Sequence, residues 1–194
     1  MALISAIDYI TDSLDNKSHT AGVFLDLSKA FDTVNHNILL SKLNHYGIRG
    51  NALQWFKSYL SNRTQGVKYN DVVSSSRAIG IGVPQGSILG PLLFIIYINE
   101  LSVVVPKLKS IIFADDTTLF LSSSDLFQLK QDLNKELKQL SQWFESNKLS
   151  INIKKTHYML FSLNKNVQNT QFDVKINETS DLKGVQYEIF GCLH

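Results

Sequence analysis

The sequence predicts an α+β fold in which helices cover one face of an antiparallel sheet. Two observations predict it. Apolar residues recur at helical spacing in several segments, most clearly between residues 126 and 144, where leucines and a final phenylalanine step by three and four. Between these segments lie short apolar runs bounded by turn residues, which is the pattern of β-strands. The runs at residues 110–114 and 117–121 indicate a hairpin with Asp115 and Asp116 at its turn.

Length and composition suit one globular domain or slightly more. The chain has 194 residues, 44% of them hydrophobic, and a net charge of +2, which is too mild to identify a nucleic-acid binder by charge alone. Its single cysteine, Cys192, excludes an internal disulfide framework and suits a reducing compartment. The longest apolar stretch, Ile88 to Ile98, is too short to span a bilayer, and the N-terminus lacks the basic region of a signal peptide. We therefore expect an intracellular protein, in the cytoplasm or nucleus, without a membrane partner.

The N-terminal segment predicts an amphipathic helix followed by a buried strand. Leu3, Ile7, Ile10 and Leu14 have helical spacing, and the run Gly22 to Leu27 is apolar except for Asp26 at its tip. A carboxylate at the tip of a buried strand is costly unless it is hydrogen-bonded, charge-paired or metal-bound. The alternative is that Asp26 caps the structure that follows it.

The next part of the chain predicts two helices and a hairpin. The helices are expected at residues 38–46, with Asp32, Thr33 or Asn35 as the cap, and at residues 51–60. Two strands follow around an Asn70-Asp71 turn. Their cationic residues form either a modest basic patch or a plain solvated hairpin; they are Arg63, Lys68 and Arg77.

A glycine-rich loop then leads into an apolar helix. The loop reads Gly80-Ile81-Gly82-Val83-Pro84-Gln85-Gly86-Ser87, and glycines there permit positive φ or a close approach of backbone to a ligand. We expect Ser87 to cap a helix from Ile88 to Leu101 that is apolar nearly all round and therefore buried. The loop could cradle a phosphate or a base, or it could be a tight loop without a ligand.

The adjacent Asp115 and Asp116 are the most unusual feature of the sequence. Two carboxylates at a tight turn repel each other unless a cation lies between them, and oxygen ligands without His or Cys favour magnesium or manganese over zinc. The alternative is an ordinary turn, in which Asp is common. A capped helix from about residue 126, a strand from His157 to Ser162 and a further strand at residues 172–176 are expected after it.

These motifs, in this order, resemble the palm of a reverse transcriptase, and most nearly the type found in non-LTR retrotransposons. The run Phe24-Leu25-Asp26-Leu27-Ser28-Lys29-Ala30-Phe31-Asp32 is similar to the first catalytic motif of that family. The glycine-rich loop resembles the family's template and nucleotide loop, and Phe113-Ala114-Asp115-Asp116 resembles its Asp-Asp hairpin. Residues 149–155 resemble its fourth motif. The resemblance implies a polymerase palm, with a ferredoxin-like antiparallel sheet, over residues 1–163.

The resemblance also implies a catalytic site. Asp26, Asp115 and Asp116 would be the catalytic residues, and together with the carbonyl of Leu27 they would hold two Mg²⁺ or Mn²⁺ ions. The reaction would be two-metal nucleotidyl transfer to a primer 3′-hydroxyl. The partners would be an RNA template, a DNA primer and deoxynucleoside triphosphates.

Four further residues receive substrate-binding roles from the resemblance. Phe31 would lie against the sugar of the incoming nucleotide, where its ring clashes with a 2′-hydroxyl. Gln85 and Gly86 would position nucleotide and template, and Lys155 would lie near the triphosphate.

The departures from the family pattern favour a second interpretation. We expect only partial fingers and no thumb, and residues 164–194 are expected to be a C-terminal remnant in which Tyr187 to Cys192 is a poor match to the family's primer-grip turn. The sequence thus predicts either an RNA-directed DNA polymerase domain or a truncated, inactive remnant of a retroelement that at most binds nucleic acid. Whether this chain is itself an enzyme is left open by the sequence.

Overall fold

A computed structural model of the chain describes residues 2–113, 116–164, 167, 172–177 and 180–188. The chain divides into two compact units. The first combines Met1–Ser28, Glu100–Ser146 and Ser150–His194, and the second combines Lys29–Asn99 and Asn147–Leu149. None of the helices in the described residues is both long and apolar enough to cross a membrane.

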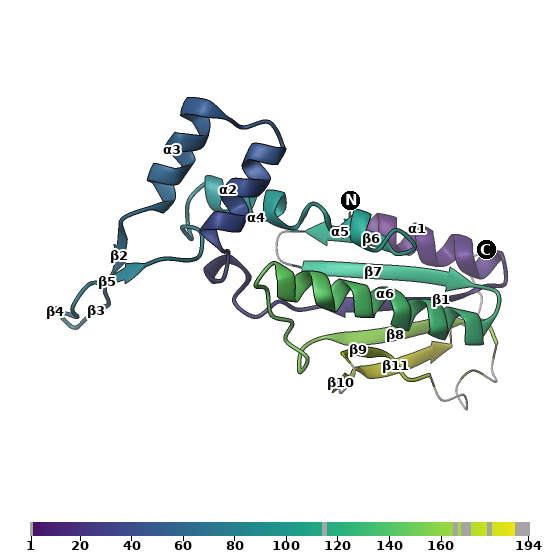
Figure 1. Ribbon diagram of the computed structural model, residues 1–194. Helices are drawn as coiled ribbons and strands as arrows, with labels where there is room; N and C mark the ends of the chain where they lie inside the picture. Colours follow the sequence, from purple (N-terminus) through teal and green to yellow (C-terminus); the bar gives the residue numbers. More distant parts are fainter. Residues whose placement is uncertain (1, 114–115, 165–166, 168–171, 178–179, 189–194) are drawn as a thin grey trace. The chain divides into compact units, whose positions relative to one another are not determined.

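The first unit is built on a five-stranded sheet with the order β11-β8-β1-β7-β6 (Figure 1). Central strand β1 pairs antiparallel with β7 and β8, and β6 pairs antiparallel with β7, whereas edge strand β11 is parallel to β8. The predicted α+β class is confirmed, with one parallel strand added to the expected antiparallel sheet. The strands are β1 (His19–Leu25), β6 (Lys109–Phe113), β7 (Asp116–Ser123), β8 (His157–Ser162) and β11 (Lys183–Glu188).

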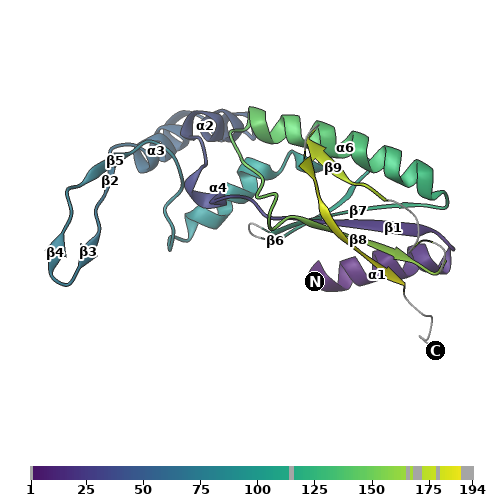
Figure 2. The same ribbon diagram turned by 90° about the horizontal axis from the view of Figure 1, so that it is seen from below.

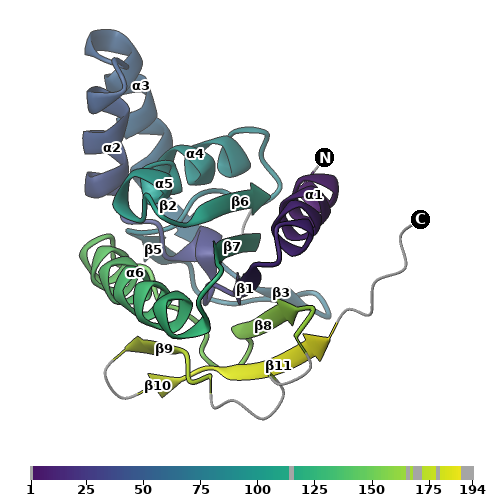
Figure 3. The ribbon, with the colours of Figure 1, turned by 90° about the vertical axis from the view of Figure 1, so that its right-hand side faces the viewer.

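Helices α1 (Ala2–Asp15) and α6 (Leu126–Ser146) lie on opposite faces of this sheet (Figures 2 and 3). The sequence placed the helices on one face only. In β1 four consecutive residues, Thr20 to Val23, are buried, and so is Leu25. Because successive side chains of a strand point to opposite faces, both faces of the sheet must be covered at this strand. Helix α6 supplies a row of buried side chains at the predicted spacing, and the short helix α5 (Leu101–Val104) packs against it.

The N-terminal half of α1 differs from the prediction. Leu14 is buried as expected, but Leu3 and Ile7 are 73% and 51% exposed. The helix reaches the sheet through its second half, where the ring of Tyr9 lies 5.8 Å from that of Phe120. The apolar periodicity therefore predicted the helix correctly but not how much of its length is covered.

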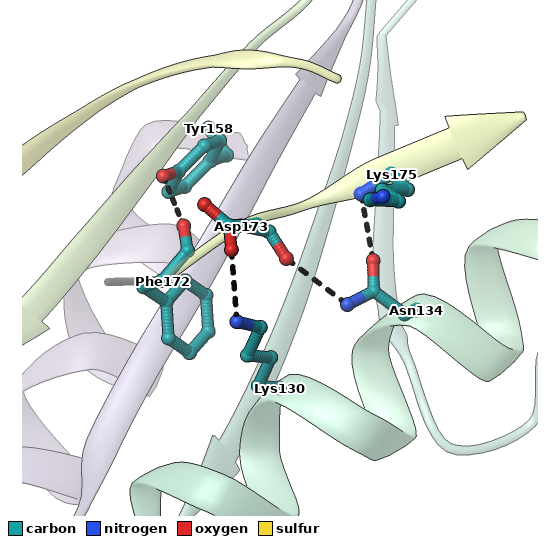
Figure 4. A network of polar contacts seen from close by, with 6 residues as sticks. All are labelled: Lys130, Asn134, Tyr158, Phe172, Asp173 and Lys175. Atoms are coloured by element: carbon teal, nitrogen blue, oxygen red, sulfur yellow. Dashed lines mark hydrogen bonds and ion pairs between the residues drawn. The ribbon is translucent and has the colours of Figure 1, made fainter. Parts of the chain in front are cut away.

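A polar network attaches the segment after β8 to α6 (Figure 4). The side-chain amide of Asn134 donates to the carbonyl of Asp173 at 3.1 Å and accepts from the backbone N–H of Lys175 at 2.7 Å. Lys130 forms an ion pair with Asp173 at 3.2 Å. One helical side chain thus takes the place of a neighbouring strand for this segment, which continues into the small β9 (Lys175–Asn177) and β10 (Ser180–Asp181) sheet.

The ring of Tyr158 crosses the neighbouring edge strand. Its hydroxyl donates to the carbonyl of Phe172, and Gly184 is the residue opposite it on β11. A Cβ atom at Gly184 would collide with the Tyr158 ring. Glycine at this position therefore lets β11 pair with β8 underneath the ring.

The second unit consists of helices α2 (His36–His45), α3 (Gly50–Leu60) and α4 (Leu89–Ile98), the short η1 helix (Ala30–Asp32) and an extended hairpin. Of the three predicted caps of α2, Asn35 is the one observed: its side chain accepts from the N–H groups of Asn37 and Ile38. Asp26 caps neither η1 nor α2, so the capping alternative for that residue is wrong.

The hairpin follows α3 and is visible as a long ribbon in Figure 2. It comprises β2 (Arg63–Gln65), β3 (Lys68–Tyr69), β4 (Val72–Val73) and β5 (Arg77–Ile79). Asn70 and Asp71 form its turn with φ of 43° and 66°, so both have the positive φ that a tight hairpin turn requires. The predicted Asn-Asp turn is confirmed.

Helix α4 is shorter and less buried than the sequence predicted. It ends at Ile98 rather than continuing to Leu101, and Leu92 and Ile95 are 50% and 44% exposed. In the second unit α4 packs against α2 and η1. Ser87 does act at the start of this helix, where its hydroxyl accepts from the N–H of Gly90 at 3.0 Å.

We predict that Asn134→Ala lowers the free energy of unfolding by about 1–3 kcal/mol, because two backbone groups lose their partner. Urea denaturation measures the change. The matched control is Gln142→Ala on the exposed side of the same helix, which should leave stability nearly unchanged. Equal destabilisation by both substitutions would contradict a role for Asn134 in attaching the segment.

Candidate functional site

The residues selected from the sequence lie in both units. Asp26, Leu27, Asp116 and Lys155 belong to the first, and the three remaining described positions belong to the second. Those three are Phe31, Gln85 and Gly86. Asp115 lies outside the described residues.

Asp26 follows directly after β1 and is held by its backbone. Its N–H donates to the hydroxyl of Thr156 at 3.2 Å, and its carbonyl accepts from the N–H of Asn152 at 2.8 Å. Thr156 is fully buried. The half-buried Asp26 carboxylate forms no hydrogen bond or ion pair with another described residue, so its oxygens are available to a ligand.

Asp116 begins β7, the strand beside β1. Leu25 is opposite Thr117 in the antiparallel β1–β7 register. Asp26, which follows Leu25, and Asp116, which precedes Thr117, therefore lie at the same end of the sheet. Asp116 is exposed and pairs with Phe113 across the hairpin. Within the described residues, no group of three or more His, Cys, Asp or Glu side chains is close enough to hold a metal ion.

The carbonyl oxygen of Leu27, like the Asp26 carboxylate, has no hydrogen-bond partner among the described residues and is available to a ligand. Leu27 forms an isolated bridge with Ile151, but the hydrogen bonds of that bridge are made by the neighbouring residues: the Ser28 N–H donates to Ser150, and the Asn152 N–H donates to Asp26. The Leu27 carbonyl therefore accepts no hydrogen bond from the described chain.

Lys155 is exposed in the turn that anchors Asp26. This turn runs from Asn152 to Thr156, and the Asn152 carbonyl accepts from the N–H groups of both Lys155 and Thr156. Asn152 and Thr156, the two residues that bind the backbone of Asp26, therefore lie on either side of Lys155 in the sequence. The structure brings Asp26, Leu27 and the Lys155 turn together around the end of β1.

In the second unit, the glycine-rich loop is attached to the turn that carries Phe31. The Phe31 carbonyl accepts from the N–H of Val83 at 2.8 Å, and the Val34 carbonyl accepts from the N–H of Gly82 at 2.7 Å. Gly82 has φ of 84°, and a Cβ atom there would lie 2.8 Å from the carbonyl oxygen of Asp32. The close approach of these two segments therefore requires glycine at position 82.

Gln85 is held by a residue that sequence reasoning did not place in the site. Its side-chain nitrogen donates to the Asp32 carboxylate at 2.6 Å. Because a carboxylate only accepts, this bond directs the Gln85 carbonyl oxygen away from Asp32 and leaves it free to accept from a ligand. Gly86, at φ of 77°, has no neighbouring atom within 4 Å of a Cβ position, and it is exposed beside Gln85.

Sequence reasoning also missed Thr156 and Asn152, which hold Asp26. Thr156 is 130 positions from Asp26, and no local pattern connects the two. Asp32 had a weak signal, because it lies within the first motif and was considered there only as a helix cap.

The buried Tyr97 connects two separate segments of the second unit through its hydroxyl group. The Tyr97 hydroxyl accepts from the N–H of Asn35 and donates to the carbonyl of Asn147 at 2.6 Å. Burial raises the pKa of Tyr97, so its hydroxyl keeps its proton at neutral pH and remains a donor. The ring of Phe31 lies 4.9 Å from that of Phe94, which holds Phe31 half-buried against α4.

Comparison with known proteins identifies one family. Residues 3–187 match the family model for reverse transcriptase (RNA-dependent DNA polymerase). The chain is 32% identical over 168 residues to a probable RNA-directed DNA polymerase from transposon BS of Drosophila melanogaster, and 29% identical over 163 residues to the RNA-directed DNA polymerase from mobile element jockey of the same organism. Each alignment covers 80% of this chain and 18% of the relative, so the chain spans less than a fifth of the length of these proteins.

Solved structures share the fold. An apo telomerase from Candida tropicalis, truncated from its C-terminal domain, matches 81% of this chain and 34% of its own length with a TM-score of 0.62 at 17% identity. A telomerase from Candida albicans in complex with a fragment of telomeric RNA matches 89% of this chain and 32% of its own length with a TM-score of 0.58 at 14% identity. The predicted polymerase-palm architecture is confirmed by this similarity.

Substitution of Thr156 tests how Asp26 is held. We predict that Thr156→Val lowers the free energy of unfolding by about 1–2 kcal/mol, because the Asp26 N–H then has no acceptor. Thr156→Ser keeps the hydroxyl and should retain most of the stability. Chemical denaturation of both variants measures the difference, and a serine variant as unstable as the valine variant would refute the importance of this bond.

Two glycines of the loop form a matched pair for a second test. We predict that Gly82→Ala costs about 2 kcal/mol or more of unfolding free energy, since the new methyl group meets the Asp32 backbone at a positive φ. Gly80→Ala has no atom within 4 Å of the new Cβ and should cost much less. Thermal denaturation of the two variants makes the comparison, and similar losses would show that the loop does not depend on close approach at position 82.

Proposed function

Because the chain belongs to the reverse transcriptase family, we propose that it carries the palm of an enzyme of a non-LTR retrotransposon that copies RNA into DNA. The substrates are an RNA template, a DNA primer with a free 3′-hydroxyl and deoxynucleoside triphosphates. The observation that carries the proposal is the placement of Asp26 and Asp116 at the same end of two adjacent central strands.

The oxygen atoms at this end of the sheet fit divalent metal ions, which the reverse transcriptase family uses. The Asp26 carboxylate and the Leu27 carbonyl have no partner among the described residues, and the Asp116 carboxylate is exposed next to them in the register. These atoms, together with the Asp115 carboxylate, are the hard oxygen ligands that Mg²⁺ and Mn²⁺ prefer. Two such ions, when bound, lower the pKa of a hydroxyl nucleophile and stabilise the charge on a leaving pyrophosphate.

The reaction is displacement at phosphorus. The primer 3′-oxygen forms a bond to the α-phosphorus of the nucleotide, the bond to the pyrophosphate oxygen breaks, and the hydroxyl proton is released. We assign Lys155 to the pyrophosphate, as a charge partner or proton donor, because it is an exposed cation in the turn that anchors Asp26.

Residues of the second unit receive the roles of selecting and positioning the nucleotide. Phe31 is held against Phe94, so its ring is a rigid surface for the nucleotide sugar and disfavours a 2′-hydroxyl. Gln85, oriented by Asp32, offers its carbonyl oxygen as an acceptor, and Gly86 leaves space for backbone to approach template or nucleotide.

Primer extension tests the proposal. The chain is given a poly(rA) template, an oligo(dT) primer, dTTP and either Mg²⁺ or Mn²⁺, beside its Asp26→Asn and Asp115→Asn variants. We expect the parent chain to extend the primer and both variants to lose at least about 100-fold in extension rate, because each substitution removes the charge of a proposed metal ligand. A loss of this size is typical when a group that stabilises the transition state electrostatically is removed. Asp71→Asn, at the hairpin tip, is the control and should extend normally.

Mn²⁺ binding separates the two interpretations of the sequence. Titration of the chain with Mn²⁺ should show binding that Asp26→Asn weakens and Asp71→Asn does not. Metal binding without extension would favour the second interpretation, a chain that retains the site without catalysis. Extension that survives Asp26→Asn would refute the assignment of that residue.

A further inference from the structure

The peptide group between Gly82 and Val83 is held at both of its ends by residues 31–36. Its N–H, on Val83, donates to the carbonyl of Phe31 at 2.8 Å. Its carbonyl, on Gly82, accepts from Nε2 of His36 at 2.7 Å. A peptide group is planar and moves as one body. Loss of the bond from His36 therefore lets the plane turn and weakens the bond to Phe31 as well.

The glycine at position 82 makes this peptide group easy to turn. Gly82 is required by its close approach to the Asp32 backbone, and its φ of 84° lies in a region that glycine occupies freely. Without a Cβ atom its ψ is also little restricted, so steric hindrance alone does not set the direction of the 82–83 peptide group. The hydrogen bond from His36 supplies the direction that the glycine backbone does not.

His36 projects from a fixed position. It is the first residue of α2, directly after Asn35, whose side chain accepts from the N–H groups of Asn37 and Ile38. The N–H of Asn35 donates to the Tyr97 hydroxyl at 3.3 Å. The His36 side chain is half-buried, and because a carbonyl only accepts, its Nε2 carries a proton. The donor is thus carried by a capped helix end that is itself attached to α4.

The other end of the same peptide group holds Phe31. The Phe31 ring lies 4.9 Å from that of Phe94, and the Phe31 carbonyl accepts from the Val83 N–H. One contact therefore holds the side chain and the other holds the backbone. If the 82–83 peptide group turns, the backbone contact is lost and the residue can shift while its ring still touches α4. The direction of this peptide group thus governs how precisely the Phe31 ring is placed.

We propose that His36 is a positioning residue for nucleotide selection. Through the 82–83 peptide group it holds the backbone of Phe31, so that the Phe31 ring discriminates against a ribose 2′-hydroxyl. Discrimination by a steric clash is sharp only when the ring cannot retreat from the clash. The inference rests on the proposed function, which assigns the sugar to Phe31, and it adds the residue that keeps the ring in place.

A purely structural role for His36 has a different signature. If its bond only stabilised the second unit, its loss would weaken the binding of deoxy- and ribonucleotides in the same proportion. Loss of ring placement instead weakens the binding of dTTP more than that of UTP, because only the ribonucleotide gains from a ring that can retreat. The ratio of the two affinities therefore separates the two roles.

The experiment measures the dissociation constants of dTTP and UTP by titration of the chain bound to a fluorescently labelled poly(rA)/oligo(dT) complex with Mg²⁺. The primer ends in a dideoxynucleotide, so no bond can form and the result does not depend on whether the chain catalyses extension. The test variant is His36→Phe, which keeps a ring and removes the donor. His36→Gln restores a donor near the position of Nε2. His45→Phe makes the same change at an exposed position at the other end of α2 and is the matched control.

We expect the UTP-to-dTTP ratio of dissociation constants to fall about two- to tenfold in His36→Phe, the factor that corresponds to one neutral hydrogen bond. His36→Gln should recover most of the ratio, and His45→Phe should keep that of the parent. An unchanged ratio in His36→Phe, or an equal loss of affinity for both nucleotides, would overturn the proposal. So would a parent chain that binds dTTP no better than UTP. A ratio that depends on His36 in a chain that extends no primer would contradict the proposed catalysis alone.

Amide hydrogen exchange of the free chain tests the same contact without any nucleotide. We expect the Val83 N–H to exchange about two- to tenfold faster in His36→Phe, again the factor for one hydrogen bond, because the bond to the Phe31 carbonyl opens more often. His45→Phe should exchange at the parent's rate. Unchanged exchange at Val83 in His36→Phe would show that His36 does not hold the peptide group, and the proposal would be wrong.

Discussion

The candidate site depends on the hydrogen bonding of β1 along both of its edges. This strand is paired with β7 on one side and β8 on the other, so it cannot shift without breaking two ladders. Where the ladders end, the turn from Asn152 to Thr156 continues the support by binding the backbone of Asp26 from both sides. Among the described residues, the bonds that hold Asp26 all end on its own backbone N–H and carbonyl, which leaves its carboxylate for a ligand.

The same constraint explains why an acidic residue is tolerated at the end of a buried strand. An isolated carboxylate in an apolar interior is costly, but Asp26 lies one residue beyond the paired region and is only half-buried. The register places Asp116 at the corresponding point of β7. Two carboxylates at one end of a rigid sheet repel each other, and a divalent cation relieves that repulsion. The register of β1 and β7 thus determines where the proposed metal site lies.

The second unit holds its loop by a different means. Instead of a ladder, it relies on close approach at Gly82 and on single bonds such as the one from Gln85 to Asp32. The bond leaves the acceptor side of the Gln85 amide free, and it also engages one of only two acidic side chains in a unit that has eight Lys or Arg residues and therefore a charge of +6. The same Asp32 carboxylate lines an open cavity together with Lys29 and Arg63, so the cavity carries charges of both signs.

The sequence by itself determined the kinds of element and the order of the motifs. Periodicity is local, so the spacing of leucines in α6 and the Asn70-Asp71 turn were sufficient to predict a helix and a hairpin. The same local information failed for α1 and α4, because whether Leu3 or Leu92 is covered depends on distant segments. Only the tertiary structure decided which residues support the site. Thr156 reaches Asp26, and Gln85 reaches Asp32, through single hydrogen bonds across long stretches of chain, and such contacts leave no repeating trace in the sequence.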